Sequence, residues 1–227
     1  MNYTLIILGI ILILVLYILY RFITDRSSMV SSRIYLKEGA PDIKFDSLPK
    51  PGSTRYTYSL WIYVKSLQGN TDIISVTNAD VAIFKLYLEA NGNLKFDILP
   101  ENSTTTTSNI ITSNFPLQKW VCVNISVDNN IVDTYLDGKL VKSQRMDSIT
   151  HPTSTSIFKH GNTDGGSQPD IFLAEVERPA SPTDPQTAWD RYMAGNGGSY
   201  IGNMFSSYGA SLILTKDDID SKRFTLF

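Results

Sequence analysis

Cysteine is almost absent from this 227-residue sequence, which contains Cys122 alone. One cysteine cannot form a disulfide within the chain, so nothing in the sequence requires an oxidising compartment. A strong net charge is also lacking, because 20 Lys and Arg stand against 22 Asp and Glu, giving −2. No glycine-rich phosphate loop and no basic stripe occurs, which leaves nucleotide and nucleic-acid binding without support.

Histidine is scarce as well, and this argues against metal chemistry. His151 and His160 are the two histidines, and neither has a cysteine or an acidic residue beside it at metal-ligand spacing. The segment 160–166 is rich in oxygen donors but lacks the ordered spacing of a calcium-binding loop. We therefore expect no metal and no cofactor, and a calcium ion in this loop is the less favoured alternative. Cys122 alternates with valines and is expected to be a small packing residue, not a nucleophile.

A long apolar run occupies the N-terminus. Every residue from Leu5 to Tyr20 is apolar, aromatic or Gly. A helix needs roughly 20 such residues to cross about 30 Å of hydrocarbon, and residues 3–23 meet that length. We predict a transmembrane anchor over residues 1–24, with the lipid bilayer as its partner. The anchor residues are Leu5, Ile6, Ile7, Leu8, Ile11, Leu12, Leu14, Leu16, Ile18, Leu19 and Tyr20.

The residues on either side of the run bear on its fate and its orientation. A cleaved signal peptide is the rival interpretation, but no Lys or Arg precedes the run and no small-residue cleavage site follows it. Basic side chains occur only downstream, and the positive-inside rule then predicts a single-pass protein with its C-terminal domain on the cytoplasmic side. The topology-setting residues are Arg21, Arg26, Arg33 and Lys37.

Beyond the anchor, hydrophobic periodicity indicates an all-β domain. Residues 25–52 mix serines with charges and end in Pro-Lys-Pro-Gly, which predicts a stalk of extended chain that runs against the domain, with an edge strand near residues 34–36. From residue 53 onward, apolar residues alternate with polar ones, and Asn91-Gly92-Asn93 and Asp137-Gly138 are hairpin turns. We predict an antiparallel β-sandwich over 53–227. The expected strands are 56–64, 84–88, 94–98, 121–127, 131–136, 139–142 and 171–176.

One short helix is expected within this domain. Ser181 to Pro185 supplies a cap and a start, Ala188 and Tyr192 form an i,i+4 pair, and Gly195 ends the helix. The predicted helix therefore covers about 184–194. A late strand at about 211–215 is expected to return to the main sheet.

Three segments resemble a known family. Residues 120–124 and 132–139 resemble the central hairpins of laminin-G-like domains, and residues 58–64 resemble the second strand of that family. These domains belong to the concanavalin A-like lectin/glucanase sandwiches, and the resemblance covers about residues 54–178. It implies a concanavalin A-like jelly roll, whose members include many domains that only bind proteins.

A narrower resemblance concerns the C-terminal part and the overall plan. Residues 181–198 resemble a tail in virion proteins of large icosahedral, chlorella-virus-like DNA viruses, as does an N-terminal anchor followed by this sandwich. This implies a structural minor capsid protein that tethers an inner viral membrane to the capsid shell, with other capsid proteins as partners. A membrane-bound glycan-binding lectin-like module is the alternative.

A glycoside hydrolase is the least favoured hypothesis, so we expect no enzyme and no catalytic residue. Glycosidases on this fold carry two glutamates with an aspartate between them. Here Glu175 and Glu177 share a strand face, but the aspartate is missing and Arg178 follows. Trp61 and Trp120 are expected to be packing residues and not sugar platforms.

Overall fold

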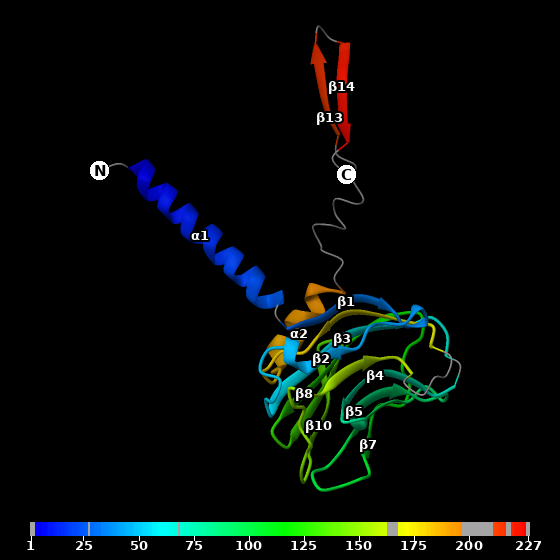
Figure 1. Cartoon of the computed structure of the whole chain (residues 1–227). Helices are drawn as coiled ribbons and strands as arrows, with labels where there is room; N and C mark the ends of the chain where they lie inside the picture. The colour runs from blue at the N-terminus through cyan, green and yellow to red at the C-terminus, as the bar shows by residue number, and fades with distance from the viewer. Residues whose placement is uncertain are drawn as a thin grey trace.

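The computed structural model describes the backbone of residues 3–26, 28–67, 69–162, 168–196, 211–216 and 219–225. Side chains are described for residues 7–20 and within 28–196 apart from 68 and 163–167. The fold is a two-layer antiparallel β-sandwich with one helix on its surface (Figure 1). The all-β sandwich predicted from periodicity is therefore confirmed.

Each layer of the sandwich is a six-stranded antiparallel sheet. The first sheet has the order β1 (Met29–Tyr35), β12 (Ile171–Glu177), β3 (Arg55–Val64), β8 (Trp120–Asp128), β9 (Ile131–Leu136) and β10 (Lys139–Arg145). The second has the order β2 (Ile43–Lys44), β11 (Ile157–His160), β4 (Thr71–Asn78), β5 (Val81–Leu88), β6 (Leu94–Ile98) and β7 (Thr107–Thr112).

The core lies between the two sheets and follows from the alternation in the sequence. On β3, the five residues Tyr56, Tyr58, Leu60, Ile62 and Val64 are at most 3% exposed. Successive strand residues point to opposite faces, so one face of each strand supplies the core and the other meets solvent or α2. Aliphatic side chains from both sheets complete a single cluster around these residues.

Most of the segment predicted as a stalk, residues 25–52, runs as extended chain within the sandwich. β1 pairs with β12 along its length, and the edge strand expected near 34–36 is this longer strand. Two short 3₁₀ helices follow, η1 (Leu36–Glu38) and η2 (Phe45–Ser47), and Leu36 and Phe45 are 1% and 0% exposed. Buried apolar side chains at irregular spacing hold this segment, and they gave no period from which to predict it.

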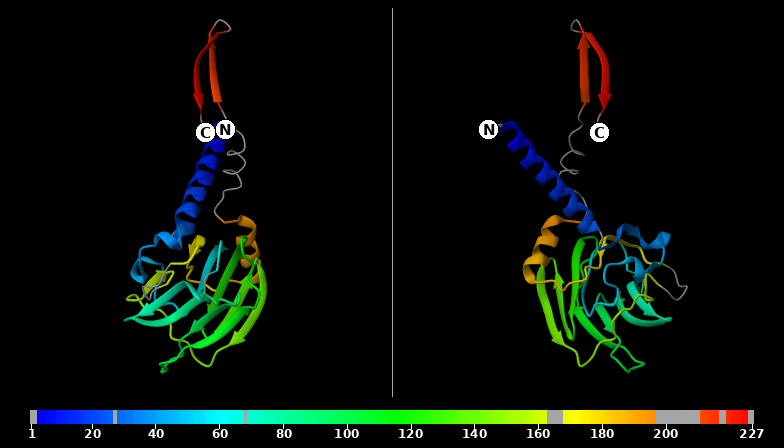
Figure 2. Two further views of the ribbon diagram at one scale, coloured as in Figure 1. Left: turned by 90° about the vertical axis from the view of Figure 1, so that its right-hand side faces the viewer. Right: turned by 60° about the vertical axis from the view of Figure 1, so that its left-hand side comes forward.

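The expected return of the late strand to the main sheet is wrong. β13 (Ser211–Lys216) pairs with β14 (Ile219–Thr225) in a separate two-stranded sheet (Figure 2). The two strands are adjacent in sequence, so their pairing closes only a short loop at small entropic cost. The helix expected at about 184–194 is formed as α2 (Pro185–Ala194), whose N-cap Asp184 accepts a hydrogen bond from the Thr187 N–H.

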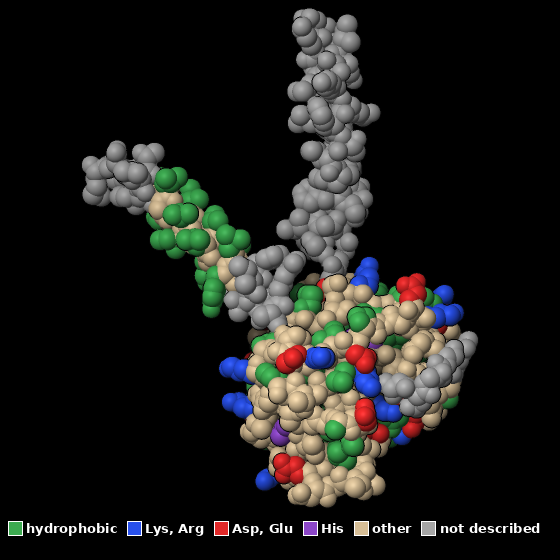
Figure 3. All heavy atoms as spheres, in the orientation of Figure 1, with side chains coloured by type: hydrophobic (Ala, Val, Ile, Leu, Met, Phe, Trp, Pro, Cys, Tyr) green, Lys and Arg blue, Asp and Glu red, His purple; other side chains and the backbone are tan. Residues whose placement is uncertain are grey.

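The N-terminal segment forms α1 (Tyr3–Arg26). Its described side chains, residues 7–20, extend from the sandwich without a packing layer around them (Figure 3). Over the residues with described side chains, no helix combines the length and the apolarity that crossing a membrane requires. The transmembrane anchor over residues 1–24 thus stays a prediction.

Candidate functional site

The outer face of the first sheet carries α2, and this layer explains the positions of two sequence candidates. Trp61 and Cys122 lie under the helix with Ala174, and the Tyr192 ring stacks on Trp61 with 5.8 Å between ring centroids. Burial raises the pKa of the Cys122 thiol to about 12, so the thiolate nucleophile is not available near neutral pH. Both residues therefore attach α2 to the sheet.

A row of aromatic rings continues across the same face. The Tyr35 and Phe172 rings stack at 4.2 Å, Phe172 meets Tyr63 at 6.1 Å, and Tyr63 meets Trp120 at 5.5 Å. The four rings stand on the neighbouring strands β1, β12, β3 and β8, where cross-strand aromatic pairs stabilise a sheet. Trp120 thus packs in a row of partly buried rings.

The two glutamates considered as an acid pair come together at a distorted point of β12. Glu175 has φ 47° at a β-bulge, where the register with β3 shifts between Ala174 and Glu177. Glu175 and Glu177 line one cavity of about 80 Å³ beside Trp61 and Arg191. Arg191 Nη2 lies 3.4 Å from Glu177 Oε2. Sites for small molecules usually measure about 300–1,000 Å³, so this cavity is too small for sugars on both sides of a scissile bond.

The two histidines lie on different segments, His151 before β11 and His160 at its end. His160 is 8% exposed and its ring packs on Phe158 with centroids 5.0 Å apart. Among the residues that the structure describes, no group of three or more His, Cys, Asp or Glu is arranged to hold a metal ion. Most of the loop considered for calcium, residues 163–166, lies outside the described residues.

Burial of His160 leads to a prediction about acid stability. Burial lowers its pKa from 6.5 to about 4, so between these values the unfolded chain binds a proton that the folded chain does not. The free energy of unfolding should therefore be highest above pH 6.5 and should fall by up to about 3 kcal/mol as the pH drops to 4. Urea titrations of the full chain at several pH values measure this free energy. His160→Gln should make it depend less steeply on pH. An unchanged slope in that variant would contradict the assignment to His160.

A polar groove opens where the outermost strands of the two sheets, β7 and β10, approach each other. Its volume is about 330 Å³, within the range of small-molecule sites. The Lys142 Nζ of β10 donates to the Ile110 carbonyl of β7 at 3.2 Å and joins the two strands beside it. The lining residues are Pro100, Thr107, Asn109, Gln144, Arg145, Met146, Asp147 and Ser148.

The chemistry of this groove is that of hydrogen bonding around a small apolar floor. Arg145 supplies N–H donors, Asp147 supplies carboxylate acceptors, and the Asn109 amide offers both. Met146 is 9% exposed, and its sulfur lies 3.4 Å from the Gln144 amide nitrogen. This set could not be predicted from the sequence, because residues 144–148 meet Pro100, Thr107 and Asn109 only in the fold.

The predicted anchor and topology residues occupy different places. Of the anchor residues, those from Ile7 to Tyr20 have exposed side chains on α1, between 50% and 66% exposed. The side chains of Leu5, Ile6, Arg21 and Arg26 lie outside the described part of the chain. Arg33 is exposed on β1 and Lys37 is exposed on η1. The structure thus places the last two on the sandwich and not on a separate stalk.

The two sheets and the α2 layer define a lectin-like β-sandwich. The family model for the concanavalin A-like lectin/glucanases superfamily, of the laminin G type, matches residues 37–176, which is 140 of 227 residues. The chain belongs to this family. The resemblance seen in the hairpin motifs is therefore confirmed for the fold.

One curated relative matches this chain over part of its length. The SH2 domain-containing protein A of Arabidopsis thaliana is 31% identical over 144 residues, 53% of this chain. The chain spans about a fifth of that relative's length, since the match covers 22% of it.

Solved structures with the same fold include two toxin domains. The binding domain of botulinum neurotoxin serotype G aligns with TM-score 0.51 and 15% identity, covering 63% of this chain and 37% of that chain. The serotype D ligand-binding domain, solved in complex with N-acetylneuraminic acid, aligns with TM-score 0.56 and 14% identity, covering 73% and 43%. At these identities the likeness establishes the fold alone.

Proposed function

We propose that this chain is a membrane-anchored recognition module that binds a saccharide through its lectin-like sandwich. The groove between β7 and β10 carries the proposal, because it offers hydrogen-bonding side chains over an apolar floor in a volume suited to one or two sugar units. Sugar hydroxyls donate to Asp147, accept from Arg145, and exchange hydrogen bonds with the Asn109 amide. Hydrolysis is not part of the proposal, and no catalytic residue or cofactor is assigned.

The membrane attachment in this proposal rests on α1. The helix has 24 residues, or about 36 Å at about 1.5 Å per residue. Its described side chains are apolar around its whole circumference and exposed, which suits hydrocarbon and does not suit water. The lipid bilayer is therefore the proposed partner of residues 3–23.

Glycan binding gives a direct test in the groove. Arg145→Ala should weaken binding at least about tenfold, because hydrogen bonds to charged groups contribute roughly 1.5–3 kcal/mol. The full chain in lipid nanodiscs is applied to a glycan array, and the saccharides it retains are titrated by calorimetry. Lys139→Ala is the matched control, since Lys139 is an exposed residue of the same strand outside the groove. No retained saccharide, or equal weakening in both variants, would refute the proposal.

The second candidate function is a minor capsid protein that tethers an inner viral membrane to a capsid shell through protein–protein contacts. The close attachment of the sandwich favours it, because α1 ends at Arg26 and β1 begins at Met29. The sandwich would then lie directly against the membrane. Particles assembled with a chain lacking residues 1–28 should lose the membrane–shell link if this candidate is correct, and glycan binding should be absent.

The side of the membrane on which the sandwich lies separates the two candidates. The basic residues downstream of the apolar run favour the cytoplasmic side, as the tether requires, whereas a lectin requires the lumenal or external side. Of the sequons within the sandwich, Asn102 is exposed and Asn124 is 0% exposed on β8, so only Asn102 can report the side in the folded chain. Glycosylation of Asn102 in microsomes would support the lectin and exclude the tether.

A further inference from the structure

α2 exposes an apolar flank that the sandwich covers only in part, where Trp189 packs on Gly138. Trp189 and Met193 lie one turn apart on this helix and are 41% and 64% exposed. Ala188 and Tyr192 lie on the side of α2 that faces the sheet and contact it. Gln186 and Asp190 border the exposed apolar pair on the same side of the helix, and the Gln186 amide donates to the Asp190 carboxylate at 2.8 Å. The flank of Trp189 and Met193 is thus an exposed apolar pair with a polar border, in addition to the side that anchors the helix.

This flank ends close to the point where α1 leaves the sandwich. The Arg178 N–H donates to the Ser28 carbonyl at 2.8 Å, and Met29 is the register partner of Glu177. Ala194, which directly follows Met193, lines the same small cavity as Glu177. Figures 1 and 2 show the C-terminal end of α2 and the base of α1 on the same side of the sandwich.

We infer that Trp189 and Met193 lie in the interfacial layer of the bilayer that α1 enters, so that α2 holds the sandwich against the membrane surface. This inference rests on the proposed insertion of α1. A residue spans at most about 3.6 Å, so the two residues between α1 and β1 keep Met29 within about 11 Å of the helix end. Tryptophan favours the membrane–water interface, and methionine adapts to an irregular apolar surface.

The charges that α2 itself carries beside the flank fit a neutral lipid surface. Asp190 and Arg191 are its immediate neighbours on α2, and they carry opposite signs. These two charges cancel, so the affinity that α2 itself contributes comes from apolar burial and does not require anionic headgroups. We therefore assign phosphatidylcholine bilayers as the surface that it binds.

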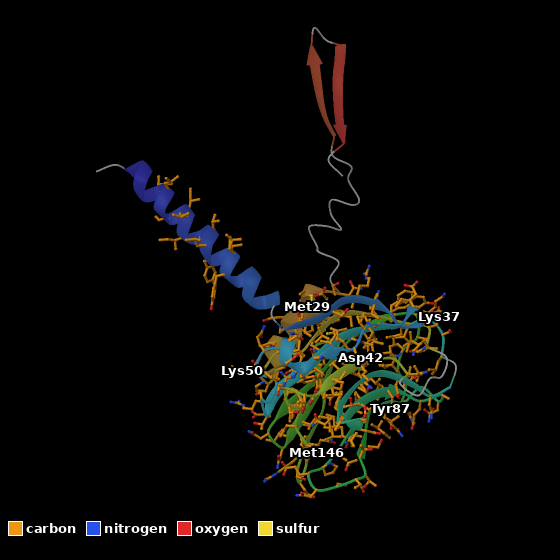
Figure 4. The ribbon with its side chains drawn as sticks, viewed as in Figure 1. Met29, Lys37, Asp42, Lys50, Tyr87 and Met146 are labelled. Atoms are coloured by element: carbon orange, nitrogen blue, oxygen red, sulfur yellow. The ribbon has the colours of Figure 1, made fainter. Side chains whose placement is uncertain are left out.

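Spin labels placed one at a time test this in the full chain. Cys122 is 1% exposed and should not react with the label. The native protein, taken through the same labelling reaction, is the control for reaction at Cys122. The labelled positions are Met193→Cys on the flank, Ile13→Cys on α1, and Asp147→Cys beside Met146, which Figure 4 labels at the end of the sandwich far from α1. In phosphatidylcholine nanodiscs, accessibility to oxygen and to a water-soluble nickel chelate reports the depth of each label.

The expected result is a graded depth. The label at position 13 should be more accessible to oxygen, and the label at position 147 should be more accessible to the nickel chelate. The label at position 193 should have intermediate accessibilities, as expected at headgroup depth. A label at Met193 as water-accessible as that at Asp147, with Ile13 in lipid, overturns the inference and leaves the anchor intact. Ile13 in water overturns the anchor, and the inference with it. Spectral broadening at Met193 that disappears on dilution with unlabelled chain would assign the flank to a second copy and refute lipid binding.

Discussion

Replacing Arg178 by methionine is expected to lower the free energy of unfolding by about 3 kcal/mol or more. Arg178 is 0% exposed and closes β12 onto the segment that precedes β3. Its Nη1 donates to the Pro49 and Lys50 carbonyls at 3.0 and 3.4 Å, and its Nη2 donates to the Pro51 carbonyl at 3.1 Å. Methionine fills similar space without donors, and each acceptor left unsatisfied in a buried place costs about 1–3 kcal/mol.

Two aromatic rings beside the guanidinium add to this effect. The Phe45 and Tyr56 ring centroids each lie 5.0 Å from the Arg178 guanidinium carbon, and cation–π contacts removed from water contribute about 2 kcal/mol. Arg178→Lys should also lower the free energy of unfolding. The lysine ammonium lacks the planar fork of the guanidinium and cannot donate to all three carbonyls. Urea unfolding of the full chain in nanodiscs, followed by circular dichroism, measures both variants.

Arg55→Met is the matched control for this experiment. Arg55 pairs with Asp128 at 2.8 Å, but its side chain is 56% exposed, and exposed ion pairs contribute at most about 1 kcal/mol. The same chemical change at the two positions should therefore differ severalfold. Equal losses would show that the 49–51 carbonyls find other donors when Arg178 is absent.

The strands that could be predicted from the sequence are those that pair with a strand next to them in the sequence. Asn91 to Asn93 turns β5 into β6, and Asp137-Gly138 turns β9 into β10, with φ of 47° and 76° at the latter pair. Alternation on β3 identified its core face in the same way. A hairpin places its partner strand a few residues away, so one window of sequence contains the whole signal.

The elements that sequence analysis missed depend on partners far along the chain. Ile34 of β1 faces Leu173 of β12 in the register, and no periodicity in either segment reveals the other. The same holds for Arg178, whose position after two glutamates gave no hint of the carbonyls at 49–51. Buried arginine needs acceptors from elsewhere in the fold, and these cannot be predicted from its immediate neighbours.

The candidate groove was missed for a related reason. Asn109 of β7 and Arg145 of β10 belong to different sheets and meet because both strands are the last of their layers. Neither strand carries a motif, since saccharide recognition needs hydrogen-bonding groups in one place and not at a fixed sequence spacing. Glu175 and Glu177 were expected to share a face of a regular strand, whereas a bulge in β12 brings the two residues to one cavity.

Gly138→Ala is expected to lower the free energy of unfolding by about 2 kcal/mol and to loosen α2. Gly138 has φ +76°, a left-handed conformation that costs an L-residue roughly 1–2 kcal/mol. A Cβ at this position would also lie 3.0 Å from the Trp189 Cα and 3.0 Å from its ring. Because the Cα belongs to the backbone of α2, it cannot move without shifting the helix.

Gly92→Ala separates the two causes, because Gly92 has φ +86° in the β5–β6 turn and nothing within 4 Å of an added Cβ. The control should lose only the conformational part, and the excess in Gly138→Ala measures the contact with α2. Urea unfolding gives both losses, and a spin label at position 193 shows whether the helix has moved. If α2 holds the sandwich to the bilayer, Gly138→Ala should shift that label toward water while Gly92→Ala leaves it in place. Equal losses in the two variants would mean that α2 adjusts to the extra methyl group without strain, and the helix would then be too compliant to fix the sandwich on the membrane.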